Sequence, residues 1–178
     1  MRVIVLLLTL AAGICQAGGF VPAQLSRAYG PFHLGMSEAD FSRLTGIKPG
    51  PCAICLPDER LAIVEGADLA RIHPQAGEES VMDFFFYRGR LYQFTVAPRE
   101  GDLKTLARRL SDRFQAPPEV DDTSPDLGQL RWQDEHTRVT LNYDPQDDRV
   151  IAIKYDDLPT LEARQAALDA QIQVAGTP

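Results

Sequence analysis

The sequence predicts an α+β fold, in which an antiparallel sheet of about six strands has helices on one face and a further helix at the C-terminus. Five segments have the alternating or β-branched and aromatic composition of strands: 81–87, 91–97, 130–134, 138–143 and 149–155. Apolar residues recur at intervals of three and four over 103–114, as in a helix that buries one side. This single helix between two groups of strands favours an antiparallel sheet over repeated strand–helix units.

The elements before the first hairpin are predicted from caps and chain breakers. A hydroxyl at Ser37 with an acid three positions later is typical of a helix start, so we expect a helix over 37–45 that ends at Gly46. Segment 47–57 holds three prolines and both cysteines of the mature chain, which favours a fixed irregular loop. We expect a further strand around 67–72.

The strongest hairpin signal is the pair 81–87 and 91–97, because Gly89 between two arginines can adopt the positive φ of a tight turn. Alternation then places one apolar set of side chains on each strand in the core. For the first strand these are Met82, Phe84 and Phe86, and for the second Tyr92, Phe94 and Val96.

In the second half, Asp102 is placed to cap the helix at 103–114, and two consecutive prolines stop it at Pro117. We expect the acidic stretch up to Asp126 to be a loop, followed by the three strands named above. Segment 158–174 is alanine-rich and predicts a helix, although its apolar stripe is narrow: Leu161, Leu168 and Ile172.

Residues 1–17 have the form of a secretory signal, with a positive charge, an unbroken apolar run and then small residues up to Ala17. The apolar run is far shorter than the roughly 20 residues of a spanning helix, so we expect no membrane span and a mature chain 18–178 that is periplasmic or secreted. Lipid attachment at Cys15 is the alternative, which Ile14 disfavours because lipoprotein processing requires a small residue there.

The length predicts one α+β domain over 18–178, with possible halves at 31–98 and 99–157 before the terminal helix. The formal net charge of −7 disfavours nucleic acid and anionic lipid surfaces as partners, because both are bound by clustered Lys and Arg.

Cys52 and Cys55 predict a structural disulfide, since an exported chain matures under oxidising conditions. A redox pair is the first alternative, but Pro57 opposes the helix that would activate the first thiol. A zinc site is the second, and it would need further ligands from His33, His73 or His136, which are widely spaced. We therefore expect no metal and no cofactor.

No pattern of residues identifies a catalytic site, and we assign no catalytic residue. Ser37 lies in a sequence that lacks the second glycine of a hydrolase elbow, and Asp144, Asp147 and Asp148 lack the spacing of a calcium loop. An exported hydrolase whose site is assembled from scattered acids and histidines stays open as an alternative, because such a site needs no sequence signature.

The chain reads as a helix followed by about three strands, twice over, which makes it a candidate internal duplication. The residues that carry this order are Gly35-Met36-Ser37 at the first helix, the hairpin 86–91, the helix end at 114–117, and Trp132 in a later strand. At these residues the chain resembles the SmpA-like outer-membrane assembly lipoproteins and the β-lactamase inhibitor protein fold. The resemblance implies helices packed on one face of an antiparallel sheet and a role in binding other proteins.

We therefore expect an exported, non-catalytic module that binds a protein or cell-envelope component. The predicted contact residues are aromatic and apolar side chains of the hairpin, because they cannot all be interior if only one face of the sheet is covered: Phe85, Tyr87, Leu91 and Tyr92. The opposing interpretation is that both faces are covered, the second partly by the terminal helix.

Overall fold

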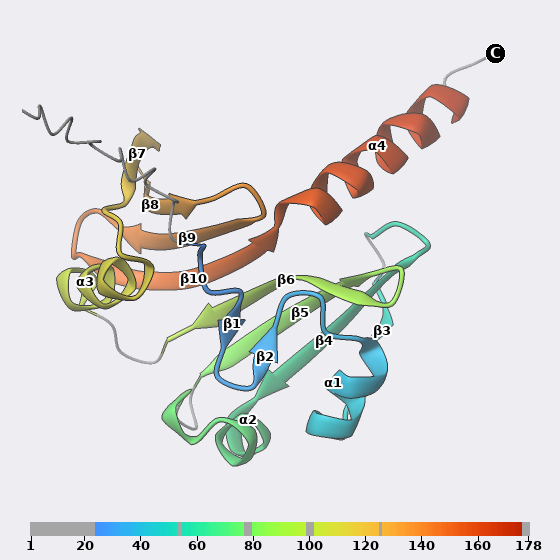
Figure 1. Ribbon diagram of the computed structural model, residues 1–178, viewed down its shortest axis with the longest axis horizontal. Helices are drawn as coiled ribbons and strands as arrows, with labels where there is room; N and C mark the ends of the chain where they lie inside the picture. The colour runs from blue at the N-terminus through green and yellow to red at the C-terminus, as the bar shows by residue number, and fades with distance from the viewer. Residues whose placement is uncertain (1–23, 53–54, 77–79, 99–101, 125, 176–178) are drawn as a thin grey trace, which may run out of the picture.

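The protein is described here from a computed structural model that covers residues 24–52, 55–76, 80–98, 102–124 and 126–175. The predicted α+β class is confirmed: one antiparallel sheet runs in the order β3-β4-β5-β6-β10-β9-β8-β7 (Figure 1), with eight strands rather than about six. Its strands are β3 Gly50–Pro51, β4 Glu59–Glu65, β5 Val81–Tyr87, β6 Arg90–Ala97, β7 Glu119–Ser124, β8 Leu127–Gln133, β9 Thr137–Asp144 and β10 Arg149–Asp157.

Four helices and a small hairpin accompany this sheet within the described residues. The helices are α1 Glu38–Thr45, α2 Gly66–Ile72, α3 Leu103–Phe114 and α4 Leu158–Ala175, and a short 3₁₀ turn spans Pro74–Ala76. The hairpin of β1 Ala28–Tyr29 and β2 Phe32–His33 forms a separate two-stranded sheet that the sequence reasoning did not anticipate.

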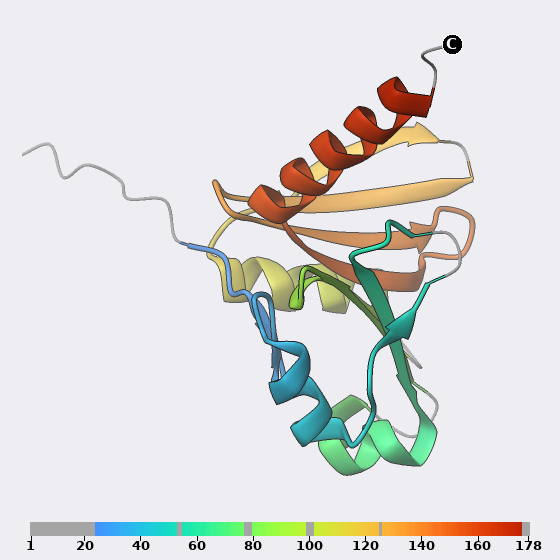
Figure 2. The ribbon, with the colours of Figure 1, turned by 90° about the vertical axis from the view of Figure 1, so that its right-hand side faces the viewer.

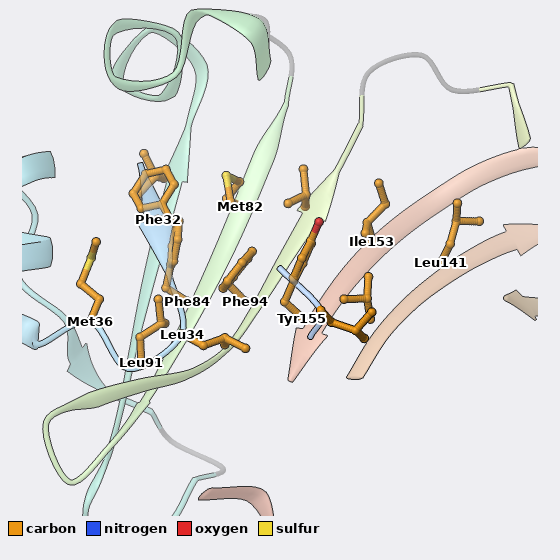
Figure 3. Packing of buried hydrophobic residues seen from close by; sticks show 14 of the residues in the cluster. Phe32, Leu34, Met36, Met82, Phe84, Leu91, Phe94, Leu141, Ile153 and Tyr155 are labelled. Carbon is orange, nitrogen blue, oxygen red and sulfur yellow. The ribbon is translucent and has the colours of Figure 1, made fainter. Parts of the chain in front are cut away.

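The main core lies on one face of the large sheet, which we call the inner face. Side chains from successive strands line up there, among them Phe84, Phe94, Tyr155 and Leu141 (Figure 3). Three helices cover these side chains, α1 with Phe41, α2 with Leu69 and α3 with Phe114. The segment around β1 and β2 closes the core with Phe32, Leu34 and Met36 (Figure 3). Burial of this apolar surface is the main stabilising contribution to the fold.

The local signals that predicted α1, α3 and the central hairpin are confirmed. The Ser37 hydroxyl accepts a hydrogen bond from the Asp40 amide at 3.1 Å and so caps α1. The Asp102 carboxylate accepts one from the Thr105 amide at 2.8 Å and caps α3. Gly46 ends α1 with φ of 78°, and Gly89 adopts φ of 77° in the two-residue turn between β5 and β6. Each of these signals lies within a few residues of the structure it determines.

Two predictions of secondary structure were wrong, and one strand was missed. Segment 67–72 belongs to α2 rather than to a strand, because Leu69 and Ile72 lie three apart and pack toward the core on one side of a helix. The strand preceding it is β4, which the sequence reasoning missed. The acidic stretch after Pro118 is not a loop: it forms the edge strand β7, whose backbone pairs with β8.

The C-terminal helix was predicted, but it does not join the other helices on the inner face. It packs Leu161, Ala167 and Leu168 against a second cluster on the opposite face of the sheet, which we call the outer face. Residues 169–173 are exposed, and Figures 1 and 2 both show this end of α4 projecting beyond the strands. Among the described helices, none combines the length and the apolar character that crossing a membrane would require. The predicted signal, Cys15 and the start of the mature chain lie outside the described residues.

Candidate functional site

The four predicted contact residues do not form an exposed patch. Leu91 belongs to the main core, while Tyr87 and Tyr92 are buried, with relative exposures of 4% and 3%. The two tyrosine rings meet edge to face at 6.5 Å, and Phe85 is partly buried beside them. Helix α4 covers this aromatic cluster. Both faces of the sheet are therefore covered where β5 and β6 carry these side chains.

A register shift in the hairpin explains why Tyr92 was placed on the wrong face. Phe85 pairs with Gln93, but Phe86 pairs with Leu91, so the extra residue Tyr92 lies between these pairs as a bulge. Leu91 therefore takes the inner position beside Phe86, and Tyr92 faces α4. Simple alternation along the strand cannot anticipate such a shift.

A buried carboxylate fixes α4 over the aromatic cluster. Glu59 is almost completely buried and accepts hydrogen bonds from the Tyr92 hydroxyl at 2.6 Å and the Leu56 amide at 2.7 Å. Arg164 of α4 donates through Nε to Oε1 and through Nη2 to Oε2, the latter at 3.2 Å. Burial alone would raise the pKa of the Glu59 carboxyl, but the Arg164, Tyr92 and Leu56 donors outweigh it and lower this pKa below its ordinary value.

The predicted disulfide between Cys52 and Cys55 is confirmed, with an Sγ–Sγ distance of 1.99 Å. It closes a small loop ahead of β4, next to Leu56, whose side chain packs in the aromatic cluster. Within the described residues between Cys52 and Glu59, no helix begins at either cysteine, so the dipole that activates redox thiols is missing there. The bond is positioned to hold the loop that carries Leu56.

The three histidines belong to different parts of the fold: β2, the end of α2, and the turn between β8 and β9. His33 is exposed on β2, and His73 is buried in edge-to-face contact with Tyr29, its ring centroid 5.1 Å from that of the tyrosine. Burial lowers the pKa of His73 and so favours its neutral form. His136 is exposed and lines a pocket beside the end of α3. The described residues include no group of three or more His, Cys, Asp or Glu arranged to hold a metal ion.

A pocket of about 580 Å³, which we call the α3 pocket, lies where the end of α3 meets β8 and residues 24–25. Leu25, Phe114 and Trp132 give it an apolar floor, while Glu119, Glu135 and His136 are exposed at its rim. Asp134 also lines it, but both carboxylate oxygens accept backbone amide protons: Oδ2 from Leu25, and Oδ1 from His136 and Thr137. This pocket therefore pairs one histidine with exposed acids and with an acid that already has a structural role.

Asp144 and Asp147 have the local roles expected of a hairpin turn. The Asp144 carboxylate accepts a hydrogen bond from the Gln146 amide at 2.9 Å, and the Asp147 carboxylate accepts one from the Arg149 amide at 3.0 Å. Both carboxylates lie within 4.0 Å of the Arg149 guanidinium. Such contacts order the turn between β9 and β10.

The outer face is polar where α4 does not cover it. Six side chains from β8, β9 and β10 line a pocket of about 260 Å³, which we call the basic pocket: Gln129, Arg131, Arg138, Thr140, Asn142 and Lys154. The register places Arg131 beside Thr140, and Thr140 beside Lys154, in one row across the three strands. The residues on either side of Thr140 in β9, Val139 and Leu141, point into the core.

A completely buried carboxylate holds two cations in the basic pocket. Asp156 is 0% exposed, and its Oδ2 accepts hydrogen bonds from Arg138 Nε and Nη2 at 3.1 and 3.0 Å. Lys154 Nζ lies 3.2 Å from the same oxygen. The two cations share one carboxylate and keep one net positive charge between them. Arg138 and Lys154 are each about one third exposed, so solvent reaches both.

Two buried acceptors on β9 and β10 are unpaired among the described residues. Asn142 Oδ1 and Asp156 Oδ1 are buried oxygen atoms without a hydrogen-bond donor. Both atoms are sealed from solvent, and Asp156 does not line the pocket, so neither oxygen is a contact point for a ligand there. The pocket offers positive charge together with the polar side chains of Gln129 and Thr140.

Sequence reasoning missed the basic pocket because its residues come from three strands. The alternating polar positions Arg138, Thr140 and Asn142 are visible in the sequence, but alone they indicate only the solvent side of a strand. Their meeting with Arg131 and Lys154 depends on the strand order β8-β9-β10 and on its register.

Comparison with known proteins places the chain in no family. No protein-family model matches it, and no curated protein matches it. A cysteine-rich secretory protein from Staphylococcus aureus is similar in structure over 79% of this chain and 50% of that protein, with 6% sequence identity and a TM-score of 0.45. This chain thus spans about half the length of that protein, and likeness at this level carries no argument about function.

Proposed function

We propose that this chain is an exported, non-catalytic binding module that holds a protein or a cell-envelope component against the uncovered half of its outer sheet face. The observation that carries the proposal is the basic pocket, in which the buried Asp156 holds Arg138 and Lys154 at a solvent-accessible surface. A buried carboxylate is costly unless its partners are held well, so this arrangement specifies where the two cations lie.

The charge of the whole chain makes this pocket distinctive. The protein has a net charge of −7, yet three of the six residues that line the pocket are cationic. Positive groups gathered on one surface of an acidic protein direct a negatively charged partner to that surface. The proposed site therefore differs from the aromatic patch expected from sequence, which α4 covers.

Two further features agree with the proposal. The pattern of residues 1–17 is that of a secretory signal, and the Cys52–Cys55 disulfide suits an oxidising compartment. The resemblance to exported modules that bind other proteins points to the same kind of role. A hydrolytic role finds less support, because the described acids in the α3 pocket are either exposed or bound to backbone amides.

The test is capture from a cell-envelope extract with the purified protein immobilised. Lys154→Gln removes one pocket cation and leaves Arg138 to satisfy Asp156, so the fold should persist. Lys104→Gln, on the exposed side of α3, makes the same change of charge on the other side of the sheet. We expect Lys154→Gln to lose a partner that Lys104→Gln retains.

Thermal unfolding of each variant establishes that the comparison is between folded proteins. A partner captured equally by both variants, or lost equally from both, would contradict the proposal. Loss in both would indicate attraction to overall charge rather than to this surface.

A further inference from the structure

The uncovered outer face continues past the basic pocket onto β6, β5 and β4. The register places four side chains in one row across β4, β5, β6 and β10, each beside the next, and we call them the outer row: Ile63, Asp83, Thr95 and Lys154. The residues before and after each of them along its strand belong to the main core, so all four side chains point to the outer face. The outer row meets the basic pocket at Lys154.

Asp83 places a carboxylate without a partner in the middle of this face. No donor or cation among the described residues pairs with it, and burial alone raises its pKa above the ordinary value. Neither of its oxygens is sealed from solvent, in contrast to Asp156 Oδ1. The fold has already removed part of its hydration, so a cation from outside would pair with it at a smaller further cost of desolvation than at an exposed acid.

Ile63 adds apolar surface beside this carboxylate. Its side chain is 50% exposed, which departs from the polar character of the rest of the uncovered face. Val81 and Phe85 lie on the same side of β5 as Asp83, and both are partly buried. Surfaces that contact other proteins combine apolar side chains with polar groups at their margin. The outer row therefore has the composition of a protein contact, with an acid at its centre and a cation at one end.

The spacing of these two charges indicates the shape of the partner. Asp83 is on β5 and Lys154 on β10, with β6 between them, so two strand spacings of about 4.8 Å place them about 10 Å apart. On an α-helix, residues seven positions apart lie on the same side and about 10.5 Å apart. In an extended strand, same-side residues lie about 7 or 13 Å apart. A helix therefore fits the two charges better than a strand.

From this complementarity we propose that the outer row binds an α-helix of another protein, which carries a basic residue and, seven positions away on the same side, an acidic one. The basic residue pairs with Asp83 and the acidic residue with Lys154. An apolar residue four positions beyond the basic one contacts Ile63. This inference rests on the proposed function and deepens it, because it states that the component held against the uncovered outer face is a protein.

A second copy of this chain does not supply such a helix. Helices α1, α2 and α3 cover the inner face. The free end of α4 projects beyond the strands (Figures 1 and 2), but the single charged residue among 169–173 is Asp169. The basic residue of α4, Arg164, is bound to Glu59. The partner is therefore a different protein.

The experiment is a titration of the ¹⁵N-labelled protein with synthetic helical peptides, followed by NMR. The matched peptide is rich in alanine and glutamine, with one lysine, a glutamate seven positions after it and a leucine four positions before it. The control peptide has the same composition, but its glutamate lies nine positions after the lysine, on the opposite side of the helix. We expect the matched peptide to shift amide signals of β4, β5, β6 and β10, with a dissociation constant on the order of 1 mM. The control peptide should bind about 3- to 5-fold more weakly, because it loses the contact with Lys154.

Paired changes in the protein and the peptide test each contact separately. Asp83→Asn should weaken the matched peptide about 5-fold, and should have no effect on a peptide whose lysine is replaced by glutamine. Lys154→Gln should show the same coupling with the peptide's glutamate. Because Asp83 has no partner in the free protein, Asp83→Asn should leave the fold intact, which thermal unfolding checks. Asp112→Asn makes the same change of charge on the exposed side of α3 and should not alter binding.

Three results would overturn the inference: no shift with the matched peptide up to 20-fold above the expected constant of about 1 mM, equal binding of the two peptides, or losses on Asp83→Asn that do not depend on the peptide's lysine. If envelope capture still depends on Lys154 while any of these is found, the partner class is wrong and the proposed surface stands. If capture is also independent of Lys154, both proposals fail.

Discussion

The contact between Arg164 of α4 and the buried Glu59 should determine whether α4 stays on the sheet. Replacing Arg164 by alanine leaves the Glu59 carboxylate with only the Tyr92 hydroxyl and the Leu56 amide as donors. Removing one partner of a fully buried ion pair costs roughly 3–5 kcal/mol. Arg164 is 26% exposed, so water can replace part of the contact. We therefore expect Arg164→Ala to lower the free energy of unfolding by about 2–3 kcal/mol.

For a chain of this length, such a loss lowers Tm by roughly 4–12 °C. Differential scanning calorimetry at pH 7 measures it directly. Glu59→Gln in the Arg164→Ala background should recover part of the loss, because it removes the charge that was left without a partner. The two changes should therefore couple by about 1–2 kcal/mol.

The pH dependence supplies a second readout. Since the folded protein lowers the pKa of Glu59 below its ordinary value of 4.5, the contact stabilises the fold above that pH and loses this effect as the pH falls through the folded pKa. Arg164→Ala should therefore cost much less in acid than at pH 7. A variant as stable as the parent protein at pH 7, or one equally destabilised at both pH values, would refute the role given to this pair.

Other features of the fold give further predictions. A Cβ at Gly128 would lie 2.2 Å from Cζ of Tyr143, so Gly128→Ala should lower the free energy of unfolding in urea by about 2 kcal/mol. In a Tyr143→Ala background the same change should cost under about 0.5 kcal/mol. Equal costs in the two backgrounds would contradict this steric explanation. Reducing the Cys52–Cys55 disulfide, which closes a very short loop, should lower the free energy of unfolding by only about 2 kcal/mol and leave the chain folded. Complete unfolding on addition of reductant would show that the disulfide has a larger role. Because burial lowers the pKa of His73, its neutral form contributes stability above pH 6.5 that is lost as the pH falls further. His73→Phe should therefore flatten the plot of unfolding free energy against pH between pH 7 and 5. An unchanged slope there would exclude His73 as the source of this pH dependence.

The elements predicted correctly from sequence are those whose determinants are local. The caps of α1 and α3 and the turn at Gly89 each depend on residues at most a few positions apart. The strand β7 was missed because its acidic composition disfavours a strand, and only pairing with β8 makes it one. Tertiary contacts override composition at such an edge.

The site was harder to predict than the fold for a related reason. The aromatic residues of the hairpin were correctly seen as too numerous for one face, but whether α4 covers them depends on the contact between Glu59 and Arg164, which are 105 positions apart. The basic pocket depends in the same way on three strands in register. Periodicity identifies which side chains alternate, and it does not identify which strands become neighbours.

The position of β10 has a consequence for the time at which the molecule can assemble. This strand lies between β6 and β9, although it is the last strand to be synthesised. Until it arrives, β6 has one unpaired edge, and the Tyr155 ring that stacks on Phe94 at 4.6 Å is missing. Long-range pairing of this kind also slows folding. A chain that emerges N-terminus first, from a ribosome or a translocation pore, therefore cannot close its sheet until β10, at residues 149–157, has passed through.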